Sequence, residues 1–162
     1  MIRRLAIAAL CALGCARAPA PPAGGGPPAA RLRGLDFSAE LEVTPPSPTK
    51  LDGSVRVTNR SATPETLVFA DGCPVRLRVY EVRGTRNAPV WEGPAACAGV
   101  AEPLTLAISP GESVTLPIPP TTADEILDGG LPPEAYRVTV WLAPEDRVIE
   151  IEAGQVELTT SR

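Results

Sequence analysis

Short runs of alternating apolar and polar residues, separated by turn-forming residues, fill the chain from residue 35 onward and constrain its fold most. A period of two is that of a strand with one buried face. The runs expected as strands are 37–43, 51–57, 66–70, 75–79, 90–91, 104–108, 114–118, 136–142 and 148–158. Eight or nine short strands with turns between them predict an all-β fold, an immunoglobulin-like antiparallel sandwich over residues 35–162.

One helical signal interrupts this pattern. Thr122 and Glu125 have the spacing of a capping box, the apolar pair Ile126-Leu127 follows, and Gly129-Gly130 is a stop signal. We expect one or two helical turns that cap one end of the sandwich.

The aromatic residues are few, and we therefore expect each of them to occupy a layer of the core. They are Phe37, Phe69, Tyr80, Trp91, Tyr136 and Trp141. Tyr136 begins an alternating run directly after a proline turn, the position of the tyrosine corner in immunoglobulin-like folds.

The first 14 residues have the features of a signal peptide. Arg3 and Arg4 precede the uncharged apolar run 5–13, which is too short to cross a bilayer. Gly14-Cys15 follows at once and predicts a bacterial lipoprotein signal over 1–14, with Cys15 as the lipidated residue. The alternative is cleavage after Ala18 and simple secretion.

Residues 15–34 are expected to be a lipid anchor and a flexible tether. Apart from Cys15, this stretch contains little but alanine, proline, glycine and arginine, with Leu32 as its one large apolar residue. Such a composition buries too little apolar surface to offset the entropy of folding.

The absence of histidine from all 162 residues excludes several chemistries. It removes the Ser-His-Asp and Cys-His nucleophile pairs, the imidazole base and the histidine-ligated metal. Residues 35–162 hold all 19 acidic residues and 10 of the 15 basic ones, a formal charge of −9. This charge disfavours nucleic acid and anionic surfaces as partners. We expect no catalytic residue, no metal and no cofactor.

Cys73 and Cys97 are the cysteines left once Cys11 and Cys15 are assigned to the signal segment. In an exported chain, two cysteines that flank a strand pair predict a disulfide.

The acidic groups do not have the spacing of a calcium loop. Asp124, Glu125 and Asp128 lie around the short helix, and Glu145-Asp146 follow a proline in an expected hairpin turn. We interpret both groups as solvated surface.

The order of several short motifs over about residues 51–143 resembles the BsuPI-type proteinase-inhibitor domain. The matching segments are Val57-Thr58-Asn59, Leu67-Val68-Phe69, Asp71-Gly72-Cys73, Val79-Tyr80, Val90-Trp91, Leu106, Ser109-Pro110-Gly111-Glu112-Ser113, Leu131-Pro132-Pro133 and 136–142. The chain departs from the family at Glu134-Ala135, where glycine is usual. The resemblance implies an immunoglobulin-like fold and possible proteinase inhibition, and it assigns no reactive-site residue.

Two function classes follow. The first is an exported, lipid-anchored, non-catalytic binding domain at the cell envelope, a proteinase inhibitor if the resemblance extends to activity, with an unidentified protein partner such as a protease. The second is a structural or assembly module of the bacterial envelope without inhibitory activity. An enzyme is a distant third. The candidate binding loop comprises Arg83, Gly84, Thr85, Arg86 and Asn87.

Overall fold

The computed structural model describes residues 29–44, 48–83, 88–93 and 102–161, and in these the chain is an all-β sandwich, as predicted. All strand pairs are antiparallel. The elements are β1 (Ala29–Leu32), β2 (Leu35–Thr44), β3 (Lys50–Asn59), β4 (Glu65–Phe69), β5 (Arg76–Glu81), β6 (Trp91–Gly93), β7 (Leu104–Ile108), β8 (Ser113–Thr122), α1 (Ala123–Leu127), β9 (Ala135–Leu142) and β10 (Ile149–Glu157).

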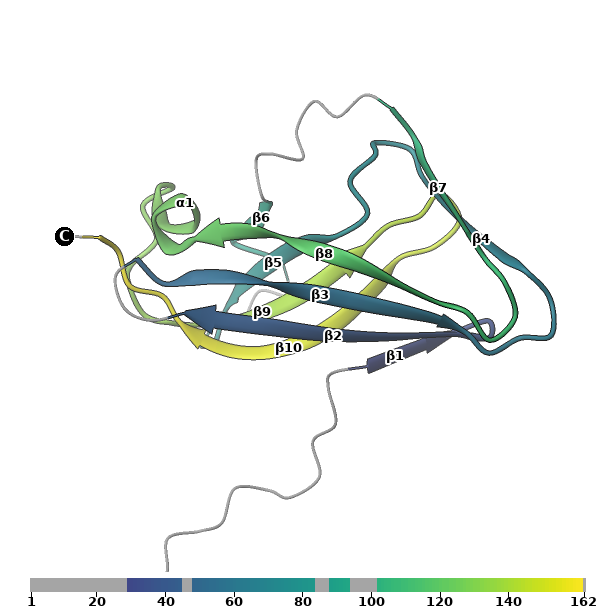
Figure 1. Ribbon diagram of the computed structural model, residues 1–162. Helices are drawn as coiled ribbons and strands as arrows, with labels where there is room; N and C mark the ends of the chain where they lie inside the picture. Colours follow the sequence, from purple (N-terminus) through teal and green to yellow (C-terminus); the bar gives the residue numbers. More distant parts are fainter. Residues whose placement is uncertain (1–28, 45–47, 84–87, 94–101, 162) are drawn as a thin grey trace, which may run out of the picture.

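Two four-stranded sheets form the layers, and a third, small sheet covers one end (Figure 1). Sheet 1 has the order β1-β2-β3-β8, and sheet 2 has the order β10-β9-β5-β6. The small sheet consists of β4 and β7. In Figure 1, α1 and the C-terminal residues lie at the opposite end from the small sheet. The sandwich therefore has two structurally different ends, and the long strands of sheet 1 run from one to the other.

The core lies between the two large sheets and is built from the inward positions of the alternating runs. On β9, Tyr136, Val138, Val140 and Leu142 are all fully buried. Burial of every second residue fixes the register of a strand, because a slip by one residue would turn the apolar set to solvent. The alternation read from the sequence therefore identifies the core face of this strand correctly.

The expected tether, residues 15–34, is wrong at its C-terminal end, where β1 forms. Residues 29–32 were expected to belong to a flexible segment, but they pair with β2 from Ala29↔Ser38 to Leu32↔Leu35. Arg33 and Gly34 both have positive φ, 48° and 83°, as a tight two-residue hairpin turn requires. Ala30 and Leu32 pack against the core. Residues 29–32 are therefore ordered by the tight turn and by pairing with β2, although their own composition does not predict a strand.

β8 continues beyond the predicted residues 114–118, up to Thr122, although it contains Pro117, Pro119 and Pro120. A central strand donates backbone N–H groups to the strands on both of its sides, and proline has no N–H to donate. Among the described strands, β8 is the edge strand of sheet 1 and pairs with β3 alone, so its prolines leave no second neighbour without a donor. They also make this edge a poor template for another chain.

Asn59 forms the corner at which the chain leaves sheet 1 for the small sheet. Its side chain is fully buried and donates to the carbonyls of Thr63 (2.8 Å) and Ile108 (2.9 Å). Its Oδ1 accepts from the backbone N–H and the hydroxyl of Ser61, both at 2.8 Å. The corner therefore joins the β3–β4 and β7–β8 connections through one side chain.

Two further local predictions are confirmed. Thr122 is the N-cap of α1, and its hydroxyl accepts from the backbone N–H of Glu125 at 3.3 Å. The Tyr136 hydroxyl donates to the carbonyl of Pro132, four residues earlier, at 2.7 Å, which is the contact of a tyrosine corner.

The expectation that every aromatic side chain lies in the core is wrong for Trp141. Phe37, Phe69 and Tyr136 are fully buried, and Tyr80 is buried too. Trp91 is half-buried and packs against the core from the side. Trp141 is half-buried and lies outside the core cluster, because on β9 it alternates with the inward residues Val140 and Leu142 and points to the outer face.

Candidate functional site

Most of the candidate loop lies outside the described residues. Of Arg83–Asn87, only Arg83 is described, and it is exposed just beyond the end of β5. It borders an open cavity of about 470 Å³ whose other walls include Val82, Glu134 and Gln155. Val82 beside it is 42% exposed, one of the few exposed large apolar side chains of the described chain. The loop therefore begins where β5 ends, beside the start of β9 and near the end of β10.

The predicted cysteine sites are only partly described. Cys15 and Cys97 lie outside the described residues. Cys73 is buried, with its Sγ 3.6 Å from the carbonyl oxygen of Val75, just before β5 begins. The lipidation and the disulfide therefore remain predictions.

β5, the strand that leads into the candidate loop, is held from both sides. β5 pairs with β9 over Arg76–Glu81 and with β6 over Leu77–Val79. The backbone N–H of Val90 donates to the carbonyl of Val79 at 2.8 Å, which closes the β5–β6 hairpin at its loop end. A loop on such a base has fixed ends.

A row of arginines and aromatic rings covers the outer face of sheet 2, and we call it the Trp141 ladder. The guanidinium carbon of Arg78 lies 4.0 Å from the centroid of the Trp141 ring, and that of Arg76 lies 5.4 Å from it. Arg137 lies 4.2 Å from the centroid of the Tyr80 ring. Stacked cation–π contacts of this kind hold the arginines flat on the sheet. The alternation of residues 136–142 was a sufficient signal that Trp141 faces outward.

Carboxylates complete the ladder. Glu92 pairs with Arg78 at 2.8 Å and Glu152 with Arg137 at 2.8 Å. Glu150 accepts from the hydroxyls of Tyr80 (2.6 Å) and Thr139 (2.7 Å).

The ladder determines the ionisation of Glu150. Burial opposes ionisation, but the hydrogen bonds from Tyr80 and Thr139 and the charges of Arg78 and Arg137 outweigh it, so the pKa of Glu150 is lowered. For Tyr80, burial, followed by its hydrogen bond to the Glu150 carboxylate, raises the pKa. Glu150 is thus held as an anion and Tyr80 as a neutral donor, the states that suit fixed recognition groups.

Two of the acidic residues singled out in the sequence, Asp124 and Asp146, have structural partners. Asp124 on α1 accepts from the backbone N–H of Ser161 at 2.9 Å and from its hydroxyl, which fastens the C-terminal residues to the helix. Asp146 pairs with Arg147, and a hydrogen bond from that guanidinium lowers the pKa of the carboxyl. Within the described ranges, no group of three or more acidic or cysteine side chains is arranged to hold a metal ion.

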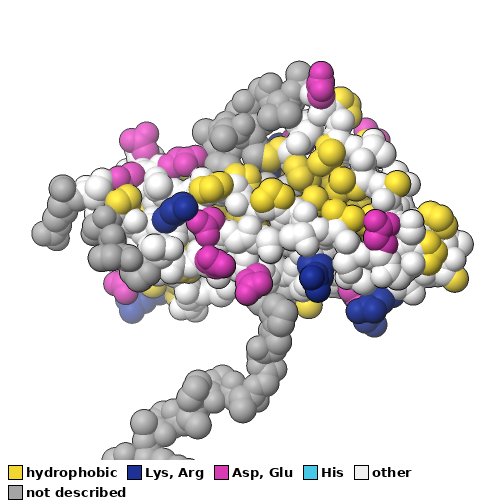
Figure 2. Space-filling model, in the orientation of Figure 1, with side chains coloured by type: hydrophobic (Ala, Val, Ile, Leu, Met, Phe, Trp, Pro, Cys, Tyr) yellow, Lys and Arg dark blue, Asp and Glu magenta, His cyan; other side chains and the backbone are white. Residues whose placement is uncertain are grey.

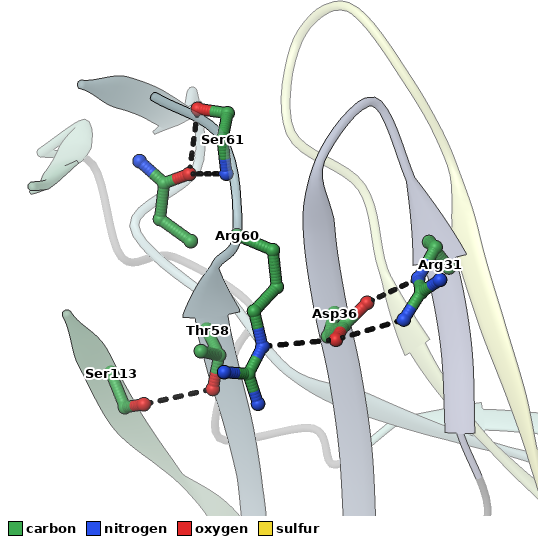
Figure 3. Close-up of polar contacts among 7 residues, drawn as sticks. Arg31, Asp36, Thr58, Arg60, Ser61 and Ser113 are labelled. Atoms are coloured by element: carbon green, nitrogen blue, oxygen red, sulfur yellow. Dashed lines mark hydrogen bonds and ion pairs between the residues drawn. The ribbon is translucent and has the colours of Figure 1, made fainter. Parts of the chain in front are cut away.

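A second polar surface, which the sequence did not reveal, lies on the outer face of sheet 1. Arg31 on β1 and Arg60 after β3 both bind the carboxylate of Asp36 on β2, the first through Nε at 2.5 Å and the second at 3.2 Å (Figure 3). The hydrogen bond from Arg31 is the main cause of a lowered pKa of Asp36. Thr58 and Ser113 bind each other through their hydroxyls at 2.8 Å beside this group.

These residues border an open cavity of about 580 Å³, the arginine cleft, which is lined by Arg31, Arg56, Arg60, Asp36, Ser38 and Thr58 among others. Its lining residues come from β1, β2, β3 and β8 and from positions up to 84 residues apart, from Ala29 to Ser113. Only the pairing of β1 with β2, absent from the sequence-based expectation, brings Arg31 to it.

Comparisons with known proteins give no functional assignment. No family model and no curated protein matches the chain. A solved β-glucosidase from Listeria innocua in complex with gluconolactone aligns with 20% identity and a TM-score of 0.37, over 78% of this chain and 17% of that chain. A β-glucosidase from Kluyveromyces marxianus in complex with glucose aligns with 16% identity and a TM-score of 0.39, over 76% of this chain and 14% of that chain. This chain thus spans less than a fifth of either enzyme, and likenesses this weak carry no argument about its activity.

Proposed function

We propose that the chain is an exported, non-catalytic binding domain, held at a membrane of the bacterial envelope by lipid on Cys15, and that its ligand is a protein. Residues 1–14 supply the signal and Cys15 the attachment point. Within the described residues no helix has the length and apolar character needed to cross a bilayer, and the proposed attachment is through the lipid.

The observation that carries the binding proposal is the support given to the β5–β6 hairpin. β5 has a strand on each side, the Trp141 ladder on its outer face and the core on its inner face. A binding loop gains affinity when its ends are already ordered, because less entropy is lost in the complex. Arginine, tryptophan and tyrosine, which build the ladder, are the residue types that contribute most at protein interfaces.

Three of the described carboxyl groups do not have the chemistry of a general acid. Asp36, Asp146 and Glu150 all have lowered pKa values, because arginines and hydroxyls bind their ionised forms. A general acid needs the opposite shift.

The BsuPI resemblance makes a protease the first partner to test. The purified mature protein is titrated against a panel of serine proteases and metalloproteases, with Arg83→Ala as the loop variant. Lys50→Ala, at the first residue of β3 in the other large sheet, is the charge-matched control. Inhibition that is weakened at least tenfold by Arg83→Ala and unchanged by Lys50→Ala supports an inhibitor with this loop at its contact.

Absence of inhibition at micromolar protein would exclude the inhibitor and leave the structural or assembly module. Crosslinking in the native cell would then identify the envelope partner.

The anchor has its own test. Mass spectrometry of the mature amino terminus is expected to show diacylglyceryl modification of Cys15. A free amino terminus at Pro19, left by cleavage after Ala18, would contradict the anchor and leave the binding proposal intact.

A further inference from the structure

The arginine cleft gathers positive charge at one place on an acidic domain. Arg31 and Arg60 share the single carboxylate of Asp36. Arg56 lines the same cavity, and among the described residues it makes no ion pair. Its cross-strand neighbours are the hydroxyl residues Ser38 on β2 and Thr115 on β8. The cleft therefore has three guanidinium groups against one carboxylate, with neutral hydroxyl donors between them.

The opposite half of the same face is acidic. Nearer α1, a second cavity of about 460 Å³ is lined by Glu40, Glu42 and Asp52 together with Pro117 and Pro120. In the space-filling view, acidic side chains gather between the middle of the face and α1, and basic side chains lie both in the half toward β1 and near the α1 end (Figure 2). The two cavities of this face therefore differ in the charge of their linings, although the domain as a whole is negative.

The arginine cleft lies close, along the chain, to the proposed lipid attachment at Cys15. β1 forms one wall of the cleft through Ala29, Ala30 and Arg31. Only 13 residues, 16–28, separate Cys15 from Ala29, and at full extension they span at most about 45 Å. A lipid on Cys15 therefore keeps the cleft within reach of the membrane surface, where phosphate groups are dense.

We propose that the arginine cleft binds the phosphate groups of anionic phospholipids in the membrane that holds the Cys15 lipid. The planar guanidinium fork matches phosphate oxygens geometrically, and three forks from β1 and β3 face one cavity. The acidic half of sheet 1 is repelled by the same surface. The contact therefore orients the domain, with β1 toward the bilayer and α1 away from it. This inference rests on the proposed anchor.

The test uses the mature chain with Cys15→Ser, so that no acyl chain contributes to binding. Sedimentation with vesicles of phosphatidylglycerol and phosphatidylcholine is expected to show binding that falls with added salt, and vesicles of phosphatidylcholine alone should not bind. Each arginine near an anionic surface contributes about fivefold to the partition constant. Arg56→Gln, at an exposed and unpaired position, should therefore lower binding about fivefold.

Lys50→Gln is the matched control, since it removes the same charge from the acidic end of β3. It should leave vesicle binding unchanged, and both variants should keep the parent's melting temperature. The proposal would be overturned if Lys50→Gln lowered vesicle binding as much as Arg56→Gln does, or if both vesicle types bound equally. Binding of inorganic phosphate without binding of vesicles would overturn it as well. Because the acyl chain is absent here, a failure of the anchor appears only in the mass of the native amino terminus.

Discussion

Asn59 shows how one buried polar side chain can determine where a sheet ends. Both of its amide hydrogens are donated to carbonyls, and its oxygen accepts two hydrogen bonds from Ser61. Burying so polar a group is tolerated because each of its bonding sites is satisfied.

Asn59→Ala is expected to lower the free energy of unfolding by about 3 kcal/mol, because it removes the hydrogen bond to the carbonyl of Ile108 and a fully buried side chain. Urea unfolding followed by circular dichroism measures the change. Ser61→Ala, which keeps both Asn59 donors, should cost about 1 kcal/mol. Equal costs for the two variants would contradict the role of Asn59 as the corner residue.

At the scale of elements, the β1–β2 hairpin depends on its turn. A Cβ on Gly34 would lie 2.9 Å from the Cβ of Ser61, and the φ of Gly34 is +83°. Gly111 has nearly the same backbone, with φ of +77°, but nothing lies within 4 Å of its Cβ position. The two glycines therefore separate backbone strain from steric contact.

Gly111→Ala should cost about 1 kcal/mol of stability from backbone strain alone, and Gly34→Ala should cost more, because the contact with Ser61 is added to the same strain. Thermal unfolding compares the two, and hydrogen exchange of the β1 amides shows whether the loss is local. If both alanine variants melted at the same temperature, the contact with Ser61 would not matter.

Sheet 2 should lose stability in acid through its ladder. The pKa of Glu150 is lower in the folded state than in the unfolded chain. Its contribution is therefore complete above the unfolded value of about 4.3 and is lost as the pH falls through the lower folded value. Glu150→Gln should flatten the fall of stability below about pH 4.3 in urea titrations. Glu42→Gln, at the exposed end of β2, is the control, and an identical acid profile for both would contradict the assignment.

The sequence predicted most strands and the small helix because their signals are local. Period-two burial, the Thr122 cap and the Tyr136 turn are each determined by a few neighbouring residues. β1 was missed because its order comes from pairing with β2 and from the Arg33-Gly34 turn. Its own composition contains one large apolar residue. The arginine cleft was missed for the same reason, since Arg31 reaches Asp36 only through that pairing. The outward direction of Trp141 was readable from the alternation on β9.

At the scale of the whole molecule, the small sheet links the two layers. The Asn59 corner ties it to sheet 1, and the backbone N–H of Glu145, between β9 and β10, donates to the carbonyl of Val68 at 2.8 Å. The proposed Cys73–Cys97 bridge would close the β5–β6 segment beside it.

Closing a loop of roughly 25 residues stabilises a fold by about 3 to 4 kcal/mol in the chain-entropy account. The double variant Cys73→Ser/Cys97→Ser should therefore unfold at a markedly lower urea concentration, and reduction of the parent should reproduce the change. Thiol labelling that finds both cysteines free in the native exported protein would contradict the bridge.

The hairpin of β1 has a mechanical consequence. A pull applied to the chain at Ala29 loads β1 first, and because β1 turns back on β2 its pairs open one after another and do not shear together. Opening residues 29–34 releases about 20 Å of chain while β2 stays paired with β3. In single-molecule pulling through the N-terminus, a short low-force extension should precede the main unfolding event, and its absence would show that β1 resists as part of the sandwich. In a domain attached to a membrane through Cys15, β1 would open and lengthen the tether before the two large sheets unfold.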